Sequence, residues 1–380
     1  MADAEARKPL WHADFLKVVL ADFLVCASLY MFLPVVPSLV WEAAGGRGLW
    51  AAAAAFVAGM CLVGPFCNYG LDTYRRKSVA LWGVAGMVAA TALCFWDGGV
   101  WVFCAARLLQ GGAYGVFQIA VGGTLLLDLS DSRKRTEAAH VYYWFTRLAL
   151  VLGPLAGLVV ARGYGLRFFA FGSLALCLCA GVLLWTLRVP FRAPLEPSLW
   201  SSDRFWLSRG LRLFVPLVAV AFSAGLMLGR CGGAGFYLSL GVGFWLALCL
   251  HVLLFGPHLQ RELAAGYALL LLAFLLYSWE EASGSGAGWA AGCLGCGLGL
   301  VSSRYLLSCI RICAHCERAT AQNTYLLAWE SGLLAGYSVA AVPLKNLDES
   351  SMATGAAVVA AAGIFHGLCV RRWYAAHKRK

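Results

Sequence analysis

Apolar runs of about 20 residues recur along the whole chain, and this repetition limits what the chain can fold into. A run of that length is long enough to cross the hydrocarbon core of a bilayer as a helix. Hydrophobic residues make up 61% of the 380 residues and charged residues only 13%, whereas soluble domains average about 25% charged residues. The sequence therefore excludes a disordered protein, argues against a soluble enzyme and indicates an all-α protein that crosses a membrane many times.

The apolar runs predict twelve transmembrane helices and one long loop. The predicted helices cover 16–39, 49–70, 78–96, 100–127, 138–161, 167–187, 211–231, 234–256, 262–279, 286–309, 320–343 and 351–371. The stretch 188–210 is rich in Arg, Pro, Ser and Trp and separates two sets of six. We therefore expect an N-terminal six-helix bundle over 1–187, a linker over 188–210, and a C-terminal six-helix bundle with a short basic tail over 211–380.

The basic residues lie unevenly between the two predicted membrane faces. If the N-terminus is cytoplasmic, 22 of the 30 Lys and Arg residues, Arg304 among them, fall at the inner face. Such a bias is typical of cytoplasmic loops, so we expect both termini and the linker in the cytoplasm and the protein in the plasma (inner) membrane. The net charge of +11 then reports topology, and we expect no nucleic-acid partner.

Three short patterns follow one another in the first half of the chain. The loop 68–77 carries Asp72, Arg76 and Lys77 and is similar to G-x-x-x-D-R-x-G-R-K, with departures at Asn68, Thr73 and Arg75. The fourth predicted helix contains Arg107-Leu-Leu-Gln110-Gly111-Gly112, similar to R-x-x-Q-G-x-G. The fifth contains Ala149-x-x-x-Gly153-Pro154-x-x-Gly157, similar to G-x-x-x-G-P-x-x-G.

Together these patterns resemble the major facilitator superfamily, and the third resembles its drug- and sugar-efflux proton antiporters. The resemblance implies a monomeric secondary transporter that exports a small organic molecule in exchange for protons by alternating access. It implies neither a cofactor nor a metal, and no motif of catalysis or nucleotide binding occurs. Proton-coupled uptake of a nutrient and a non-transporting membrane sensor or scaffold remain as alternatives.

Charged residues within the predicted helices are the candidates for proton coupling. Charge is costly inside a bilayer, so such residues face the protein interior and mark functional sites. Asp22 and Glu330 are the carboxylates well inside the predicted helices, and the resemblance implies that Arg107 tunes a proton-carrying acid. Gln110, Tyr114 and Gln118 are four residues apart and so share a helix face, which we expect to line the cavity. The resemblance implies that helices 1, 4, 7 and 10 surround that cavity.

Two further groups are expected to control conformation. The resemblance implies that Asp72 latches onto the N-terminus of helix 11 near Thr320 when the transporter faces outward. Arg76, Lys77, Asp128 and Arg135 are expected to belong to the same network. Gly153, Pro154 and Gly157 permit close packing and remove a backbone hydrogen bond, so we expect a packing seam and hinge there, against the helix at 234–256.

One pattern favours a different chemistry. Cys309-x-x-x-Cys313-x-x-Cys316 has the spacing of some iron–sulfur sites, in which three thiolates bind one cluster. Radical enzymes with that spacing hold the cluster in a soluble barrel, and the chain offers no segment for one. We therefore interpret these cysteines as adventitious and expect no metal site.

Overall fold

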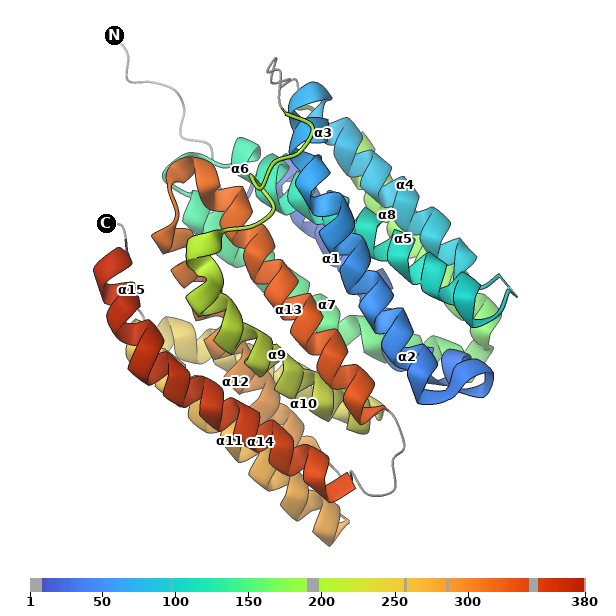
Figure 1. Cartoon of the computed structure of the whole chain (residues 1–380), viewed down its shortest axis with the longest axis vertical. Coiled ribbons are helices and arrows are strands. Elements are labelled where there is room, and N and C mark those ends of the chain that lie inside the picture. Colours follow the sequence, from blue (N-terminus) through green and yellow to red (C-terminus); the bar gives the residue numbers. More distant parts are fainter. Residues whose placement is uncertain are drawn as a thin grey trace.

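The computed structural model describes residues 9–96, 98–189, 198–255, 258–284, 287–341 and 348–378. The described residues form helices joined by short turns, with no β-strand among them (Figure 1). This confirms the predicted all-α class. Residues 190–197 of the predicted linker lie outside the described part of the chain.

The described residues of the first half form eight α-helices. They are α1 (Ala13–Met31), α2 (Val36–Val63), α3 (Cys67–Thr73), α4 (Arg76–Leu93), α5 (Gly99–Ala120), α6 (Leu126–Leu129), α7 (Arg135–Tyr164) and α8 (Leu166–Trp185). A 3-10 turn (Gly64–Phe66) joins α2 to α3, and a π-helical turn (Val121–Leu125) joins α5 to α6. The predicted helices 2 and 4 are therefore continued by short segments.

The predicted boundary between the first two helices is wrong. The sequence prediction carried helix 1 to residue 39, but α1 ends at Met31 and Pro37 lies in the first turn of α2. Proline suits a first helical turn because it lacks the N–H that a helix interior requires. Inside α2, Gly45 has φ 57° and breaks the helical geometry, which places the apolar stretch of this helix after it.

In the part of the second half that the structure describes there are seven α-helices. They are α9 (Leu211–Arg230), α10 (Ala234–Leu250), α11 (Leu259–Ser283), α12 (Gly288–Ile312), α13 (Arg318–Ala340), α14 (Asp348–Phe365) and α15 (Arg371–His377). A 3-10 turn (Ser208–Gly210) precedes α9, and another (His315–Glu317) precedes α13. π-helical turns extend α10 (His251–Phe255) and join α14 to α15 (His366–Val370).

Nine helical segments of the described residues are long and apolar enough to cross a membrane. The other three long helices are α1, α4 and α13. Helix α1 carries Asp14, Lys17 and Asp22, and α13 is buried along most of its length. A helix that other helices enclose does not need an apolar surface toward lipid, so polar residues are tolerated there.

The two halves lie side by side (Figure 1). Within the first half α1 packs against α7 and α8, and within the second α9 packs against α13 and α14. Between the halves α7 packs against α10 and α12, and α2 packs against α13. One end of the molecule holds the loops around Asp72 and Asp128 and the segment 198–210 (Figure 1). We call it the basic end, because Arg76 and Arg135 begin helices there. Residues buried between the halves therefore lie where side chains of both halves can contact them.

Candidate functional site

Asp22 of α1 lies at the centre of the first half, fully buried. Its Oδ1 accepts a hydrogen bond from Gln118 Nε2 at 2.7 Å, and its Oδ2 accepts one from Thr146 Oγ1 at 2.7 Å. The hydroxyl of Tyr142 donates to Gln118 Oε1 at 2.9 Å and so orients that amide. The Cys26 thiol, on α1 itself, donates to Oδ1 at 3.5 Å. Among the described residues no cation pairs with Asp22, so its partners are neutral donors from α1, α5 and α7.

Glu330 of α13 is the corresponding carboxylate of the second half, with 1% of its surface exposed. Its Oε1 accepts hydrogen bonds from the Tyr30 hydroxyl at 2.6 Å and from the Tyr114 hydroxyl at 3.2 Å. Tyr30 lies on α1 and Tyr114 on α5. Glu330 therefore bonds the second half to the first, again through neutral donors and with no ion pair to a described residue.

Arg107 of α5 is buried beside two neutral groups. Its Nη1 donates to the side-chain oxygen of Gln110, and its guanidinium lies 4.8 Å from the centre of the Phe56 ring. Gln110 Nε2 in turn donates to Thr91 Oγ1 at 3.2 Å. Arg107 and Glu330 line the same small cavity but form no direct bond. The structure therefore brings Arg107 near the Glu330 carboxylate and places Asp22 elsewhere, beside Gln118.

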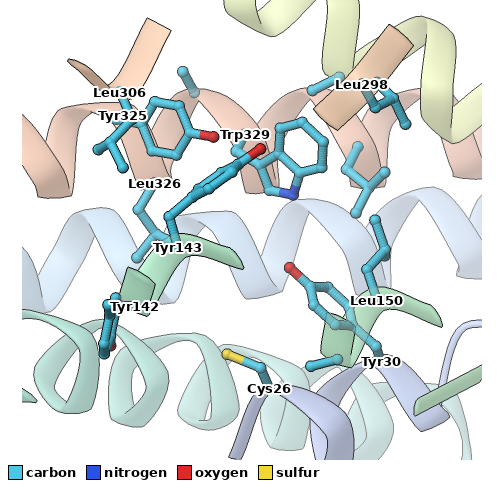
Figure 2. Packing of buried hydrophobic residues seen from close by; sticks show 14 of the residues in the cluster. Cys26, Tyr30, Tyr142, Tyr143, Leu150, Leu298, Leu306, Tyr325, Leu326 and Trp329 are labelled. Carbon is cyan, nitrogen blue, oxygen red and sulfur yellow. The ribbon is translucent and has the colours of Figure 1, made fainter. Parts of the chain in front are cut away.

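Arg147 of α7 lies between aromatic rings at the interface of the two halves. Its guanidinium carbon lies 3.4 Å from the ring centre of Trp329, 4.9 Å from that of Tyr143 and 5.8 Å from that of Tyr325. Figure 2 shows these three aromatic side chains gathered between the two halves. Arg147 lies inside the fifth predicted helix, 138–161, but the sequence analysis assigned it no role, because nothing local in the sequence brings these three rings together.

Two small cavities lie between the halves. The first, of about 50 Å³, is lined by Gln118, Tyr142, Thr146, Arg147 and Asn323, among others. The second, of about 30 Å³, is lined by Tyr30, Arg107, Glu330 and Tyr337, among others. Organic ligands need roughly 300–1,000 Å³, so either cavity must widen before an organic molecule can enter.

The helices around these cavities differ from those that the family resemblance implied. Polar side chains come from α1, α5, α7 and α13, which are the predicted helices 1, 4, 5 and 11. The predicted helix 7, α9, lines neither cavity, and the predicted helix 10, α12, contributes Leu306 alone. Of the predicted stripe on α5, Gln118 faces the first cavity, whereas Gln110 and Tyr114 bond to Arg107 and Glu330.

At the basic end, Asp72 pairs with a residue of the linker. Its carboxylate lies 2.8 Å from Nη1 of Arg204. The Arg204 backbone N–H donates to Thr320 Oγ1 at 2.8 Å, and the Leu207 N–H donates to Thr324 Oγ1 at 2.8 Å. Asp72 therefore reaches the start of α13 through the linker, and the sequence analysis missed Arg204 as its partner.

The other residues of the predicted latch stay within the first half. Arg76 pairs with Asp128 at 2.5 Å. Lys77 Nζ donates to the backbone carbonyls of Trp185 and Leu187 at the end of α8, at 2.5 and 2.8 Å, and Arg135 Nε donates to Leu127 O at 3.2 Å. These bonds fix the loops of the basic end to one another and do not extend to α13.

Gly153 and Gly157 form a packing seam with a neighbour other than the one expected. A Cβ at Gly153 would lie 2.7 Å from Ala27 O, and one at Gly157 would lie 2.4 Å from Met31 O. Both contacts are with α1 of the same half, so the expected contact with the helix at 234–256 is wrong for these residues. Pro154 lies within the continuous helix α7. The seam holds α1 close to α7 along the part of α1 that carries Tyr30.

A second buried charge cluster lies between α11 and α12. Glu262 of α11 is fully buried and forms an ion pair with Arg304 of α12. His251 Nδ1 lies 3.0 Å from Glu262 Oε1, and the His251 ring lies 4.9 Å from that of His140 on α7. The sequence analysis counted Arg304 with the inner loops, but only 3% of it is exposed. Its position inside a predicted helix was the signal for burial.

Cys309 and Cys313 are buried at the end of α12, whereas Cys316 is exposed. The described residues contain no group of three or more His, Cys, Asp or Glu side chains arranged to hold a metal ion.

The family follows from a match that covers most of the chain. Residues 18–370 match the family model described as Major Facilitator Superfamily. The chain belongs to this superfamily. Its fold agrees, since the structure of the human organic anion transporter MFSD10 (TETRAN) superposes with a TM-score of 0.65 over 94% of this chain and 100% of that chain, at 19% identity.

Two curated relatives are named for multidrug resistance or for the transport of one compound. The multidrug resistance protein MdtL of Salmonella paratyphi B is 27% identical over 48% of this chain and 49% of its own length. The probable actinorhodin transporter of Streptomyces coelicolor is 29% identical over 39% of this chain and 26% of its own length. The matches thus span between a quarter and a half of these relatives.

Proposed function

We propose that this integral membrane protein is a secondary transporter that exports a small organic molecule in exchange for protons. Membership of the superfamily supports transport over catalysis, and the relatives named for multidrug resistance and for actinorhodin transport support export. We further propose that it resides in the plasma (inner) membrane with both termini in the cytoplasm. In this proposal 1–187 and 211–380 are the moving bundles, and 188–210 links them.

The observation that carries the proposal is the pair of buried carboxylates with neutral partners. A buried charge is costly unless a cation compensates it, and neither Asp22 nor Glu330 has an ion-pair partner among the described residues. Hydroxyl and amide donors stabilise the ionised form, while the same hydroxyls can accept from a protonated carboxyl. Each group is therefore placed to gain and lose a proton.

Alternating access requires that the two ends of the molecule open in turn. At the basic end the pair Asp72–Arg204 and the bonds from the linker to α13 join the halves. At the opposite end the Tyr337 hydroxyl of α13 donates to the carbonyl of Leu33. These contacts are the proposed gates on the two sides of the central carboxylates, and each must break when its side opens.

The test is transport by purified protein in liposomes with an imposed proton gradient. Panels of drugs, sugars and metabolites are screened for uptake into vesicles that carry the protein with its basic end outward. We expect at least one class to accumulate when the lumen is acidic and to release protons from the lumen as it enters. Empty liposomes and the double variant Asp22→Asn, Glu330→Gln are the controls. Flux that does not depend on the proton gradient would contradict proton coupling. Absence of any flux would favour a sensor or scaffold.

A further inference from the structure

Arg147 has hydrogen-bonding capacity that the described structure does not use. Only 1% of its surface is exposed, and it lines the cavity of about 50 Å³ between the halves. Its Nη2 donates to the Tyr325 hydroxyl at 3.1 Å, but its Nε and Nη1 have no hydrogen-bond partner among the described residues. A buried donor without a partner costs free energy, so this guanidinium is set up to receive an acceptor.

The nearby carboxylates are bonded elsewhere. Glu330 accepts from Tyr30 and Tyr114, and Asp22 accepts from Gln118 and Thr146. Neither forms an ion pair with Arg147 in the described structure. The acceptor that Arg147 lacks must therefore come from outside the described protein or from a rearrangement.

The lining of the cavity around Arg147 carries one positive charge and several aromatic rings. Among the residues that line it, Arg147 is the one charged side chain, and the other polar groups, such as Gln118, Gln322 and Asn323, are neutral. Tyr143 and Tyr325 line the same space, and the guanidinium carbon of Arg147 lies 3.4 Å from the ring centre of Trp329. A planar guanidinium binds carboxylate or phosphate oxygens through two parallel bonds, and aromatic rings pack well against flat ligands.

We propose that this cavity binds the anionic group of an aromatic organic anion, with Arg147 as the residue that recognises the charge. The anion accepts from one of the open donors, Nε or Nη1, and from the second N–H of Nη2, which forms a parallel fork with either of them, while its ring lies against Tyr143 and Tyr325. The proposal rests on the transport function proposed above and names a cargo class for it. The cavity must widen to admit this cargo, but the proposal does not depend on the direction of transport.

The test compares two dyes of similar shape and opposite charge, measured at equilibrium on the purified protein without any gradient. Fluorescein carries a carboxylate, whereas rhodamine 123 is a cationic ester on a similar ring system. We expect Arg147→Gln to weaken fluorescein binding about tenfold or more, because a charge-assisted hydrogen bond is lost. The affinity for rhodamine 123 should stay within about twofold of the wild-type value. Arg147→Lys should recover part of the fluorescein affinity because it restores the charge without the fork.

The matched control is Arg162→Gln, which removes an exposed arginine from the same helix and should change neither affinity. Equal weakening of both dyes by Arg147→Gln, or no weakening of fluorescein, would overturn the proposal. If Arg147→Gln does not fold, a displacement experiment on the wild-type protein tests the proposal. Naphthalene-2-carboxylate must then displace fluorescein better than the neutral naphthalene-2-carboxamide, and equal displacement overturns the anion site. Because binding is measured without flux, this result is independent of the liposome test of transport.

Discussion

The molecule buries carboxylates in two regions and compensates their charge in different ways. Between α11 and α12, Glu262 has a cation, Arg304, and His251 beside it. At the centre, Asp22 and Glu330 have neutral donors, which are amide, hydroxyl and thiol groups, and no ion-pair partner among the described residues. All three are buried to the same degree. Burial by itself therefore does not distinguish a structural acid from one placed for proton exchange; the partner distinguishes them.

The largest effect on stability should come from breaking the ion pair between Glu262 of α11 and Arg304 of α12. Arg304→Met leaves Glu262 buried without its cation, and we expect the free energy of unfolding to fall by about 3–5 kcal/mol. Arg107→Met is the comparison, since Arg107 contacts no carboxylate directly and its loss should cost about 1 kcal/mol or less. Denaturation of the purified protein measures both. Similar losses would show that the two regions do not differ in the way described.

The next effect should appear in transport and not in stability. Asp22→Asn and Glu330→Gln keep the size of each side chain and most of its hydrogen bonds, so the unfolding midpoint should change little. Proton-driven accumulation in liposomes should fall about tenfold or more for the residue that carries the proton, a change of about 1.4 kcal/mol. Export down a substrate gradient should persist. A variant with full gradient-driven activity would remove its residue from the coupling mechanism.

A smaller effect connects the central carboxylate to the Arg147 cavity. Gln118 and Thr146 bond to Asp22 and also line that cavity. Removing the negative charge behind them should favour an anion, so Asp22→Asn should raise fluorescein affinity about threefold. Equilibrium dialysis measures it, with rhodamine 123 expected to change in the opposite sense. An unchanged fluorescein affinity would show that the charge of Asp22 does not act on the Arg147 cavity.

The smallest effect should come from the basic end. Asp72 and Arg204 form a partly buried ion pair, with 7% and 19% of their side chains exposed. Because Asp72→Asn keeps the size of the side chain and Arg204 keeps some contact with water, we expect a loss of about 1 kcal/mol or less. Asp72→Asn should therefore leave stability almost unchanged but speed hydrogen exchange over 203–208 and the first turn of α13. Arg204→Gln should act alike, while Arg76→Gln, which loses a bond to Asp128 instead, should not affect α13. Unchanged exchange and transport in Asp72→Asn would contradict a latch at this position.

The sequence by itself determined the membrane class, the approximate positions of most helices and the family. The hydrocarbon core imposes the length and apolarity of each run, and a charge inside such a run is visible without any structure, as Asp22, Arg107, Arg147 and Glu330 were. Helix ends were less accurate where short π and 3-10 turns continue a helix, because these do not interrupt the apolar pattern. The boundary near Pro37 was missed although its signal was local.

Only the tertiary structure decided which charge has which partner. Glu330 and Tyr30 are 300 positions apart in the chain, and the rings around Arg147 come from two helices of different halves. The linker supplies Arg204 to Asp72, and α1, not the helix at 234–256, packs on Gly153 and Gly157. Composition and spacing act along one helix, whereas the compensation of a buried charge depends on which helices approach it in space.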